Sequence, residues 1–356
     1  MTESKIVRIS IVAFSFLLVA TSIRAQQKLS ERYMDAYKKY LNATCPIPKD
    51  EIQHFVYFAR DRELIIDHPL LHHPMFTGAQ IIYAWKDLEP QKGQYDFSIL
   101  NQDYAYLKSY HKKLFIQLQD ATFNPKYNAV PDYILTAEYD GGAVLQYDDD
   151  GKPAGWVAKR WNKQVRERFS LLLQALGKEF DGIIEGINLQ ETSIGVSSRA
   201  DSTFSDQAYV IGLKENMLAL KTAFPTSTTM IYANFMSGEW LPHDDKGYLR
   251  SIYQYGEKIG VGLGGTDLMV TRKGQLNHIL ALMHEGHYTI PLGIAVQDGN
   301  YTGMTGEEVD DGGSKRKNIV PLLHAFARNF LRVNYMFWVD QEPYFREDVL
   351  PCFYGE

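Results

Sequence analysis

One glutamate stands out in this chain because of the residues that precede it. Glu191 directly follows residues 182–190, a run dominated by glycine and aliphatic side chains. Such a run predicts a buried strand, and a carboxyl group at its end would lose part of its hydration, which raises its pKa toward that of a general acid. The alternative is a rim carboxylate that forms an ion pair with Arg60 or another cation. We expect Glu191 to be catalytic.

Other polar and aromatic side chains occupy comparable positions, at or just after the ends of apolar runs of strand length. Carboxylates and amides bond sugar hydroxyls, indoles stack on the apolar faces of sugar rings, and a pair of carboxyl groups can carry out acid and base steps. This mixture predicts a carbohydrate site. The expected substrate-binding residues are Arg60, Trp85, Gln119, Asp120, Gln190, Asn234, Asp267, Gln297, Trp338 and Glu342.

These positions require a fold in which many strand ends converge. Eight runs have strand length and flanking Gly, Pro or Asp residues, at 54–59, 79–85, 113–119, 183–190, 229–235, 260–263, 289–297 and 334–339. Helical periodicity follows several of them, at 100–110, 165–180, 208–223, 276–284 and 319–331. Eightfold alternation predicts an α/β fold, a single-domain (β/α)₈ TIM barrel over residues 51–356, with its site at the carboxyl ends of the strands. The main alternative, a doubly wound open sheet, would need a G-x-G-x-x-G pattern after the first strand, and none follows it.

The spacing of the predicted strands is uneven. About 70 residues separate the starts of the third and fourth strands, so a long loop leaves the carboxyl end of strand three. This loop is rich in aromatic residues, including Phe123, Tyr147 and Trp156. We expect most of these rings to pack the loop on itself and some to stack on sugar.

Charge and the N-terminal residues indicate the partner and the compartment. The 356 residues carry a formal net charge of −6 without a dense Lys/Arg run, which disfavours a nucleic-acid partner. Residues 1–25 combine an early basic region with a short apolar run and predict a signal peptide, so we expect a secreted or periplasmic protein without stable membrane insertion after cleavage. Residues 26–50 predict an N-terminal helical segment. The two cysteines, Cys45 and Cys352, would form a disulfide or remain unrelated thiols.

A resemblance to a known group of enzymes is carried by residues 78–98, which read GAQIIYAWKDLEPQKGQYDFS. This block resembles the second strand and following loop of barrel-type glycoside hydrolases of the large retaining (β/α)₈ clan, the β-galactosidase-like and cellulase-like enzymes. The resemblance implies an acid/base Glu after strand four, preceded by Asn, and Glu191 matches with Gln190 in place of the Asn. It also implies an aromatic residue on strand eight in the sugar site, which Trp338 matches.

The chain departs from the clan pattern at strand seven. The clan has its nucleophilic Glu there, whereas this sequence has Gln297, and an amide is not a useful nucleophile. We therefore expect Asp298 to be the second catalytic carboxylate, with Asp267, Asp120 and Glu342 as alternatives. A separation of about 5–5.5 Å between the two carboxyl groups would indicate a retaining enzyme and about 6.5–9.5 Å an inverting one.

Metal and cofactor chemistry finds no support in the sequence. The histidines at 68, 72 and 73 and at 284 and 287 do not reproduce the H-E-x-x-H spacing of a zinc helix, so we expect no metal and no cofactor. The predicted function is hydrolysis of an oligo- or polysaccharide. The alternative, favoured by Gln297, is a non-catalytic carbohydrate-binding protein on the same barrel. A lyase or epimerase for acidic sugars would need a basic cluster that the strand ends lack apart from Arg60.

Overall fold

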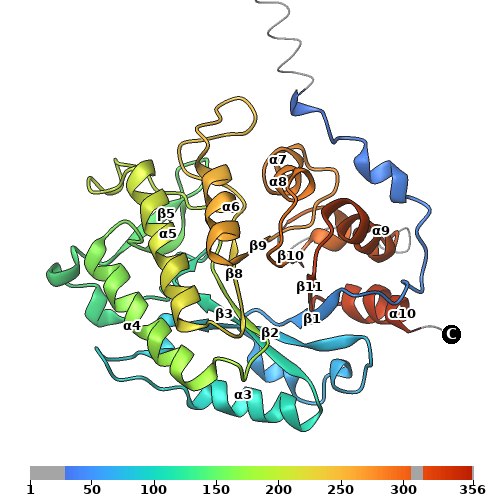
Figure 1. Ribbon diagram of the computed structural model, residues 1–356, viewed down its shortest axis with the longest axis horizontal. Coiled ribbons are helices and arrows are strands. Elements are labelled where there is room, and N and C mark those ends of the chain that lie inside the picture. The colour runs from blue at the N-terminus through green and yellow to red at the C-terminus, as the bar shows by residue number, and fades with distance from the viewer. Residues whose placement is uncertain (1–28, 306–315, 355–356) are drawn as a thin grey trace, which may run out of the picture.

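Eight parallel strands form a closed barrel in the computed structural model, which describes residues 29–305 and 316–354 (Figure 1). The order around the barrel is β1-β11-β10-β9-β8-β7-β3-β2, so sequence neighbours pair throughout apart from the inserted strands β4–β6. The barrel strands are β1 Gln53–Tyr57, β2 Phe76–Ala84, β3 Lys113–Gln119, β7 Gly186–Leu189, β8 Thr228–Tyr232, β9 Gly262–Gly265, β10 Leu292–Val296 and β11 Tyr335–Val339. The predicted (β/α)₈ barrel is confirmed.

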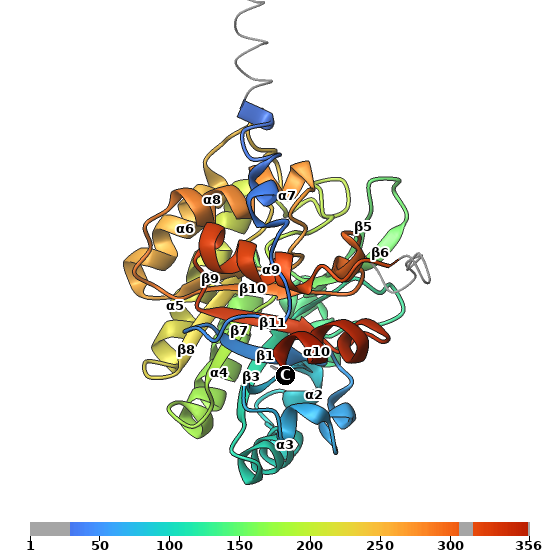
Figure 2. The same ribbon diagram turned by 90° about the vertical axis from the view of Figure 1, so that its right-hand side faces the viewer.

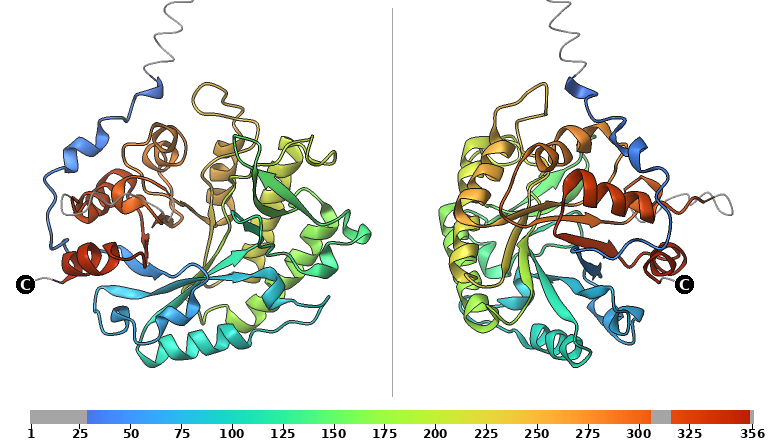
Figure 3. Two further views of the ribbon diagram at one scale, coloured as in Figure 1. Left: turned by 180° about the vertical axis from the view of Figure 1, so that it is seen from behind. Right: turned by 45° about the vertical axis from the view of Figure 1, so that its right-hand side comes forward.

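Helices surround the strands on the outside, as two further views show (Figure 3). They are α2 Trp85–Leu88, α3 Ser98–Ser109, α4 Lys163–Phe180, α5 Asp206–Ala223, α6 Tyr248–Ile259, α7 Lys273–Asn277, α8 Ile279–Glu285, α9 Val320–Phe326 and α10 Leu350–Phe353. None of the helices within residues 29–305 and 316–354 has the length and apolarity that crossing a bilayer requires. The predicted signal peptide, residues 1–25, lies outside the described residues.

Aromatic rings fill the barrel interior. Phe55, Phe115 and Phe337 come from three strands and contact one another with ring centroids 5.1–5.8 Å apart. They fit because β7 begins with Gly186, where an added Cβ would lie 2.7 Å from the Phe115 ring and 2.6 Å from the Thr228 carbonyl oxygen. A glycine at this strand start therefore makes room for the large rings that close the barrel core.

The long loop after β3 contains a small sheet of its own. Strands β4 Ala121–Thr122, β5 Ala143–Tyr147 and β6 Pro153–Ala158 pair antiparallel in the order β4-β6-β5. The sequence analysis predicts only a loop here. The sheet is a two-strand hairpin with a short third strand, and it gives the loop a fixed shape beside the carboxyl ends of the barrel strands.

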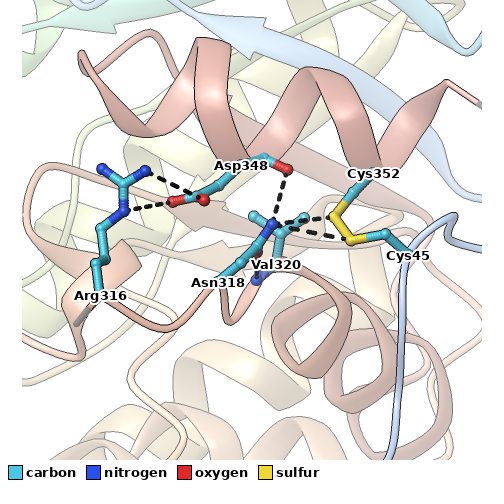
Figure 4. Close-up of a disulfide and its surroundings, with 6 residues drawn as sticks. All are labelled: Cys45, Arg316, Asn318, Val320, Asp348 and Cys352. Carbon is cyan, nitrogen blue, oxygen red and sulfur yellow. Dashed lines mark hydrogen bonds and ion pairs between the residues drawn. A yellow bond between two sulfur atoms is a disulfide. The ribbon is translucent and has the colours of Figure 1, made fainter. Parts of the chain in front are cut away.

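The N-terminal segment runs along the outside of the barrel past α9 (Figure 2). It has a short 3₁₀-helix, η1 Ala36–Tyr40, and the Tyr40 ring packs against Phe326 of α9 at a centroid distance of 5.9 Å. Cys45 forms a disulfide with Cys352 of α10 (Figure 4), as one of the two predicted alternatives requires. The Asn318 amide, just before α9, donates to the carbonyl oxygen of Asp348 at 3.2 Å and lies 3.3 Å from Cys352 Sγ. The disulfide and these contacts therefore connect the N-terminal segment, α10 and the residues before α9.

Candidate active site

A cleft of about 600 Å³ lies at the carboxyl ends of β7, β8, β9 and β10. It brings together five of the predicted site residues, Glu191, Asn234, Asp267, Gln297 and Asp298. The other residues that line the cleft are not among the predicted site residues. They are Phe123, Ser193, Phe235, Arg272, Gln275 and Thr305. A larger hollow of about 950 Å³ lies between the N-terminal segment and α8, but none of the predicted site residues lines it.

Glu191 is held by an amide from the neighbouring strand. The Asn234 Nδ2 atom donates to Glu191 Oε2 at 2.6 Å. The pKa of Glu191 is raised to about 7, mainly by burial and to a smaller extent by the charge of Asp267, against the Asn234 hydrogen bond and the Arg160 charge, which lower it. A carboxyl group with this pKa is partly protonated at neutral pH, which is what a general acid requires.

Asn234 is fixed by its own backbone contacts. Its Oδ1 atom accepts hydrogen bonds from the backbone N–H groups of Phe235 at 2.9 Å and Ser193 at 3.2 Å. Because the side-chain oxygen is occupied by donors, the amide nitrogen must point the other way, toward Glu191 and Thr266. The orientation of the Asn234 amide is therefore determined by its network.

A buried ion pair supports the backbone of Glu191. Asp120 follows β3 and accepts two hydrogen bonds from the Arg160 guanidinium, at 2.6 and 2.8 Å. Arg160 also donates to the carbonyl oxygen of Glu191 at 2.8 Å and to the Tyr209 hydroxyl at 3.0 Å. This corrects the expected role of Asp120: both of its oxygens are engaged by Arg160, so it positions Glu191 instead of contacting substrate.

Two further carboxylates line the cleft. Asp267 follows β9 with a φ of +64°, in the left-handed region, and accepts from Asn300 Nδ2 at 3.0 Å. Burial raises the pKa of Asp267. Asp298 follows β10, after Gln297. The left-handed backbone conformation of Asp267 costs free energy, and such conformations occur frequently at functional positions.

Tyr57, the last residue of β1, interacts electrostatically with the three acidic groups of the cleft, Glu191, Asp267 and Asp298. Burial raises its pKa well above the usual value, and the charges of Asp298, Glu191 and Asp267 raise it further. A phenol that stays protonated can donate a hydrogen bond. The sequence analysis missed Tyr57 because its predicted first strand, 54–59, runs two residues beyond the observed end of β1 at Tyr57.

Both predicted tryptophans lie elsewhere, which corrects the expectation that they bind sugar. Trp85 is fully buried and donates to Glu89 Oε2 at 2.9 Å. Trp338 is also fully buried, and its indole N–H donates to His54 Nδ1 at 3.1 Å on the outer side of the barrel wall, where it packs on Phe353 of α10. Side chains alternate in direction along a strand, and Phe337 takes the inward place next to Trp338.

The remaining predicted residues surround the cleft without lining it. Arg60 is exposed, and its guanidinium lies 4.0 Å from the Tyr127 ring centroid. Glu342 is exposed and pairs with Arg346 at 2.5 Å. Gln119 and Gln190 are buried, and neither Gln119 Oε1 nor Gln190 Nε2 has a hydrogen-bond partner within the described chain. A buried polar atom of this kind normally has a partner.

The block at residues 78–98 has a structural explanation. The Glu89 carboxylate is buried and accepts from the indole of Trp85, from the backbone N–H of Gly93 at 2.8 Å and from Arg168. The W-x-x-x-E spacing places the two side chains one helical turn apart on α2, and Gly93 closes the turn that follows. The motif thus fixes the exit from β2 and contributes no side chain to the cleft.

A cluster of Asp50, His54 and His324 is the candidate metal group of the described residues, with ligand atoms within 4.8 Å of one another. Its chemistry fits hydrogen bonding better than metal binding. The Trp338 indole donates to His54 Nδ1, which leaves the proton of a neutral His54 on Nε2, the atom that faces Asp50. Arg328 Nε also lies 3.4 Å from the Asp50 carboxylate. The cluster lies outside the cleft.

The fold matches solved structures of glycoside hydrolases. The catalytic domain of a β-amylase from Paenibacillus polymyxa has a TM-score of 0.53 at 9% identity, with 82% of this chain and 92% of that one covered. Endo-glycoceramidase II from Rhodococcus sp., in complex with a five-membered iminocyclitol, has a TM-score of 0.52 at 10% identity, with 84% and 75% covered. The chain matches no protein-family profile and no curated protein.

Likeness at 9–10% identity establishes the fold alone. The protein has a glycosidase-like (β/α)₈ barrel, which confirms at the level of fold the resemblance carried by residues 78–98.

Proposed function

We propose that the protein is a secreted glycoside hydrolase that acts on an oligo- or polysaccharide. The observation that carries the proposal is Glu191, a carboxyl group with a pKa of about 7 in one cleft with two aspartates. Glycoside hydrolysis needs one protonated and one ionised carboxyl group, and a glutamate that is partly protonated at neutral pH can serve as the protonated one.

In the proposed mechanism, protonated Glu191 donates its proton to the glycosidic oxygen as the bond from that oxygen to the anomeric carbon breaks. Asp298 supplies the second carboxylate. It either attacks the anomeric carbon to form a covalent glycosyl ester, which water then hydrolyses with Glu191 as base, or it removes a proton from a water that attacks directly. Asp267 is the other candidate for this role, since its charge already acts on Glu191.

The alternative function is binding without catalysis. Gln297 lines the cleft at the strand-seven position where the resemblance would place the nucleophile. A barrel that lost this carboxylate would keep its sugar contacts. The two functions predict different results for the same variants.

The first test is Glu191→Gln against a panel of aryl glycosides and polysaccharides. The amide keeps the size of the carboxyl group but cannot donate a proton as an acid, so turnover should fall by about 10²–10⁴ while glycan affinity is retained. Glu342→Gln, an exposed glutamate paired with Arg346, is the matched control and should leave turnover unchanged. Retained glycan binding without any turnover in the parent protein would support the binder instead.

The second test identifies the other carboxylate. Asp298→Ala should abolish turnover, and added azide should restore it with inverted anomeric configuration if Asp298 is a nucleophile, because a small anion can occupy the vacated space. Asp267→Ala is the matched comparison in the same cleft. Azide rescue in Asp267→Ala only would transfer the role to Asp267. Gain of activity in Gln297→Glu would identify a binder derived from an enzyme.

Secretion is part of the proposal and has its own test. The Cys45–Cys352 disulfide is compatible with an oxidising compartment. The mature protein should lack residues 1–25, and N-terminal mass measurement of the exported chain checks this. A chain that keeps these residues would argue for an anchored protein.

A further inference from the structure

An exposed tryptophan lies beside the cleft. Trp240 is in the loop between β8 and α6, and 55% of its surface is exposed. Its ring stacks on that of Phe235, with centroids 5.5 Å apart and an interplanar angle of 19°. Phe235 itself lines the cleft. The indole therefore continues an aromatic surface that begins inside the cleft.

The loop around Trp240 is anchored at several points. The backbone N–H of Leu241 donates to His278 Nε2 at 3.0 Å, and His278 Nδ1 lies 2.9 Å from the carbonyl oxygen of Gly274. The His278 ring also contacts both aromatic rings, at 4.7 Å from Trp240 and 4.4 Å from Phe235. These contacts hold the indole in one place although more than half of it faces solvent.

The residue before Trp240 strengthens this anchor. The Glu239 carboxylate is buried and accepts from the backbone N–H groups of Tyr248 at 2.9 Å and Leu249 at 2.6 Å, which belong to the first turn of α6. The Trp240 backbone also pairs with Asp244 across the loop, at 2.8 and 3.0 Å. An exposed indole costs free energy in water, and here polar contacts on both sides of it maintain that exposure.

The stacked rings of Trp240 and Phe235 reach the outer edge of the cleft. A Cβ added at Gly274 of α7 would lie 3.8 Å from Trp240 and 3.9 Å from Phe235, so this turn of α7 borders both rings. The next residue, Gln275, lines the cleft. A second ring, Phe123, is 56% exposed and lines the same cleft from the long loop after β3.

We propose that Trp240 is an outer stacking subsite for a glycan longer than the cleft. This inference rests on the proposed function. The substrate class is a chain of pyranose units whose ring faces present C–H groups, because such faces pack on aromatic rings while the hydroxyls at the ring edge reach amides and carboxylates. The reacting bond lies at Glu191, and a sugar one or more units away covers the indole.

The experiment measures binding in a protein that cannot cleave the ligand. Glu191→Gln is titrated by calorimetry with oligosaccharide ladders of two to six units from several polysaccharides. Adding Trp240→Ala should weaken binding of the longest bound oligomers about two- to tenfold and leave the shortest unchanged. Trp240→Phe should recover part of the loss. Tyr354→Ala, an exposed ring that packs on His73 before β2, is the matched control and should change nothing.

Each outcome decides a separate point. If ladders bind and Trp240→Ala has the same affinity at every length, the subsite is refuted and the proposed function stands. An equal loss at all lengths, together with a lower melting temperature, also refutes it, because the ring would then serve loop structure. If no glycan binds to Glu191→Gln, both proposals fail. A parent protein that dimerises, with Trp240→Ala monomeric by sedimentation, would assign the ring to a contact between copies.

Discussion

Replacing Asn234 by alanine should move the alkaline limb of the pH–activity profile upward. The Asn234 amide donates to Glu191 at 2.6 Å and so stabilises the ionised carboxylate. Without this donor the pKa of Glu191 rises above about 7, and the group stays protonated to higher pH. A hydrogen bond to a charged group contributes about 1.5–3 kcal/mol, and about 1.4 kcal/mol corresponds to one pH unit. Since water can enter the vacated space, we expect the lower end, a shift of about one pH unit.

The assay is kcat/KM against pH with a soluble substrate, which reports the essential groups of the free enzyme. Gln275→Ala is the control, because Gln275 lines the same cleft from α7 and should change affinity without moving the limb. A limb that stays in place, or that moves to lower pH, would refute the assignment of Glu191 as the acid.

Three further predictions concern stability. Arg160→Met leaves the buried Asp120 carboxylate unpaired and should lower the free energy of unfolding by about 3–5 kcal/mol in urea denaturation, with part of the loss recovered in an Asp120→Asn double variant. Burial lowers the pKa of His73, His278 and His324 to about 4. Between about pH 6.5 and pH 4 the unfolded chain therefore takes up protons at these histidines that the folded chain does not, so the melting temperature should fall as the pH decreases through this range. A melting temperature that does not change with pH would contradict this. Cys45→Ser with Cys352→Ser should cost about 2–4 kcal/mol of stability. Activity of this variant at low temperature should persist, since neither cysteine lines the cleft, and its loss would show coupling to the site.

The barrel is predictable from this sequence because each strand is a short apolar run with its own turn residues. Helix α6, which the sequence analysis omits, also has a readable pattern: its buried residues Leu249, Ile252, Tyr253 and Gly256 recur at the i, i+3, i+4, i+7 spacing of one helix face. One element of the fold is not predictable. The sheet β4-β6-β5 belongs to an insertion, where only three of the five residues of β5 are partly buried and one is fully buried, so its pattern does not resemble that of a barrel strand.

The site is predictable to the extent that it depends on strand ends. Glu191, Asn234 and Asp298 follow three different strands and meet in one cleft because parallel strands in a barrel end on one face. Trp338 is expected in the cleft but lies on the outer face of the barrel wall. A shift of one position along a strand turns a side chain to the opposite face, and an apolar run does not reveal which positions point inward. The contact between Phe235 and Trp240 is not predictable from the sequence. Both residues belong to one loop, and the shape of that loop depends on His278, which lies 38 positions after Trp240.

The insertion after β3 is attached to the loop that carries Glu191 at two separate places. Arg160, just beyond β6, holds the Glu191 carbonyl oxygen, and the backbone of Tyr147 at the end of β5 donates to the Gly195 carbonyl oxygen at 2.8 Å. The turn between β5 and β6, residues 148–152, is exposed. The two attachments set a boundary for loop engineering: residues 148–152 can be shortened, lengthened or exchanged without removing either contact, whereas a graft that replaces Arg160 would also displace Glu191. Sequence variation can accumulate at this turn without disturbing the backbone that positions Glu191.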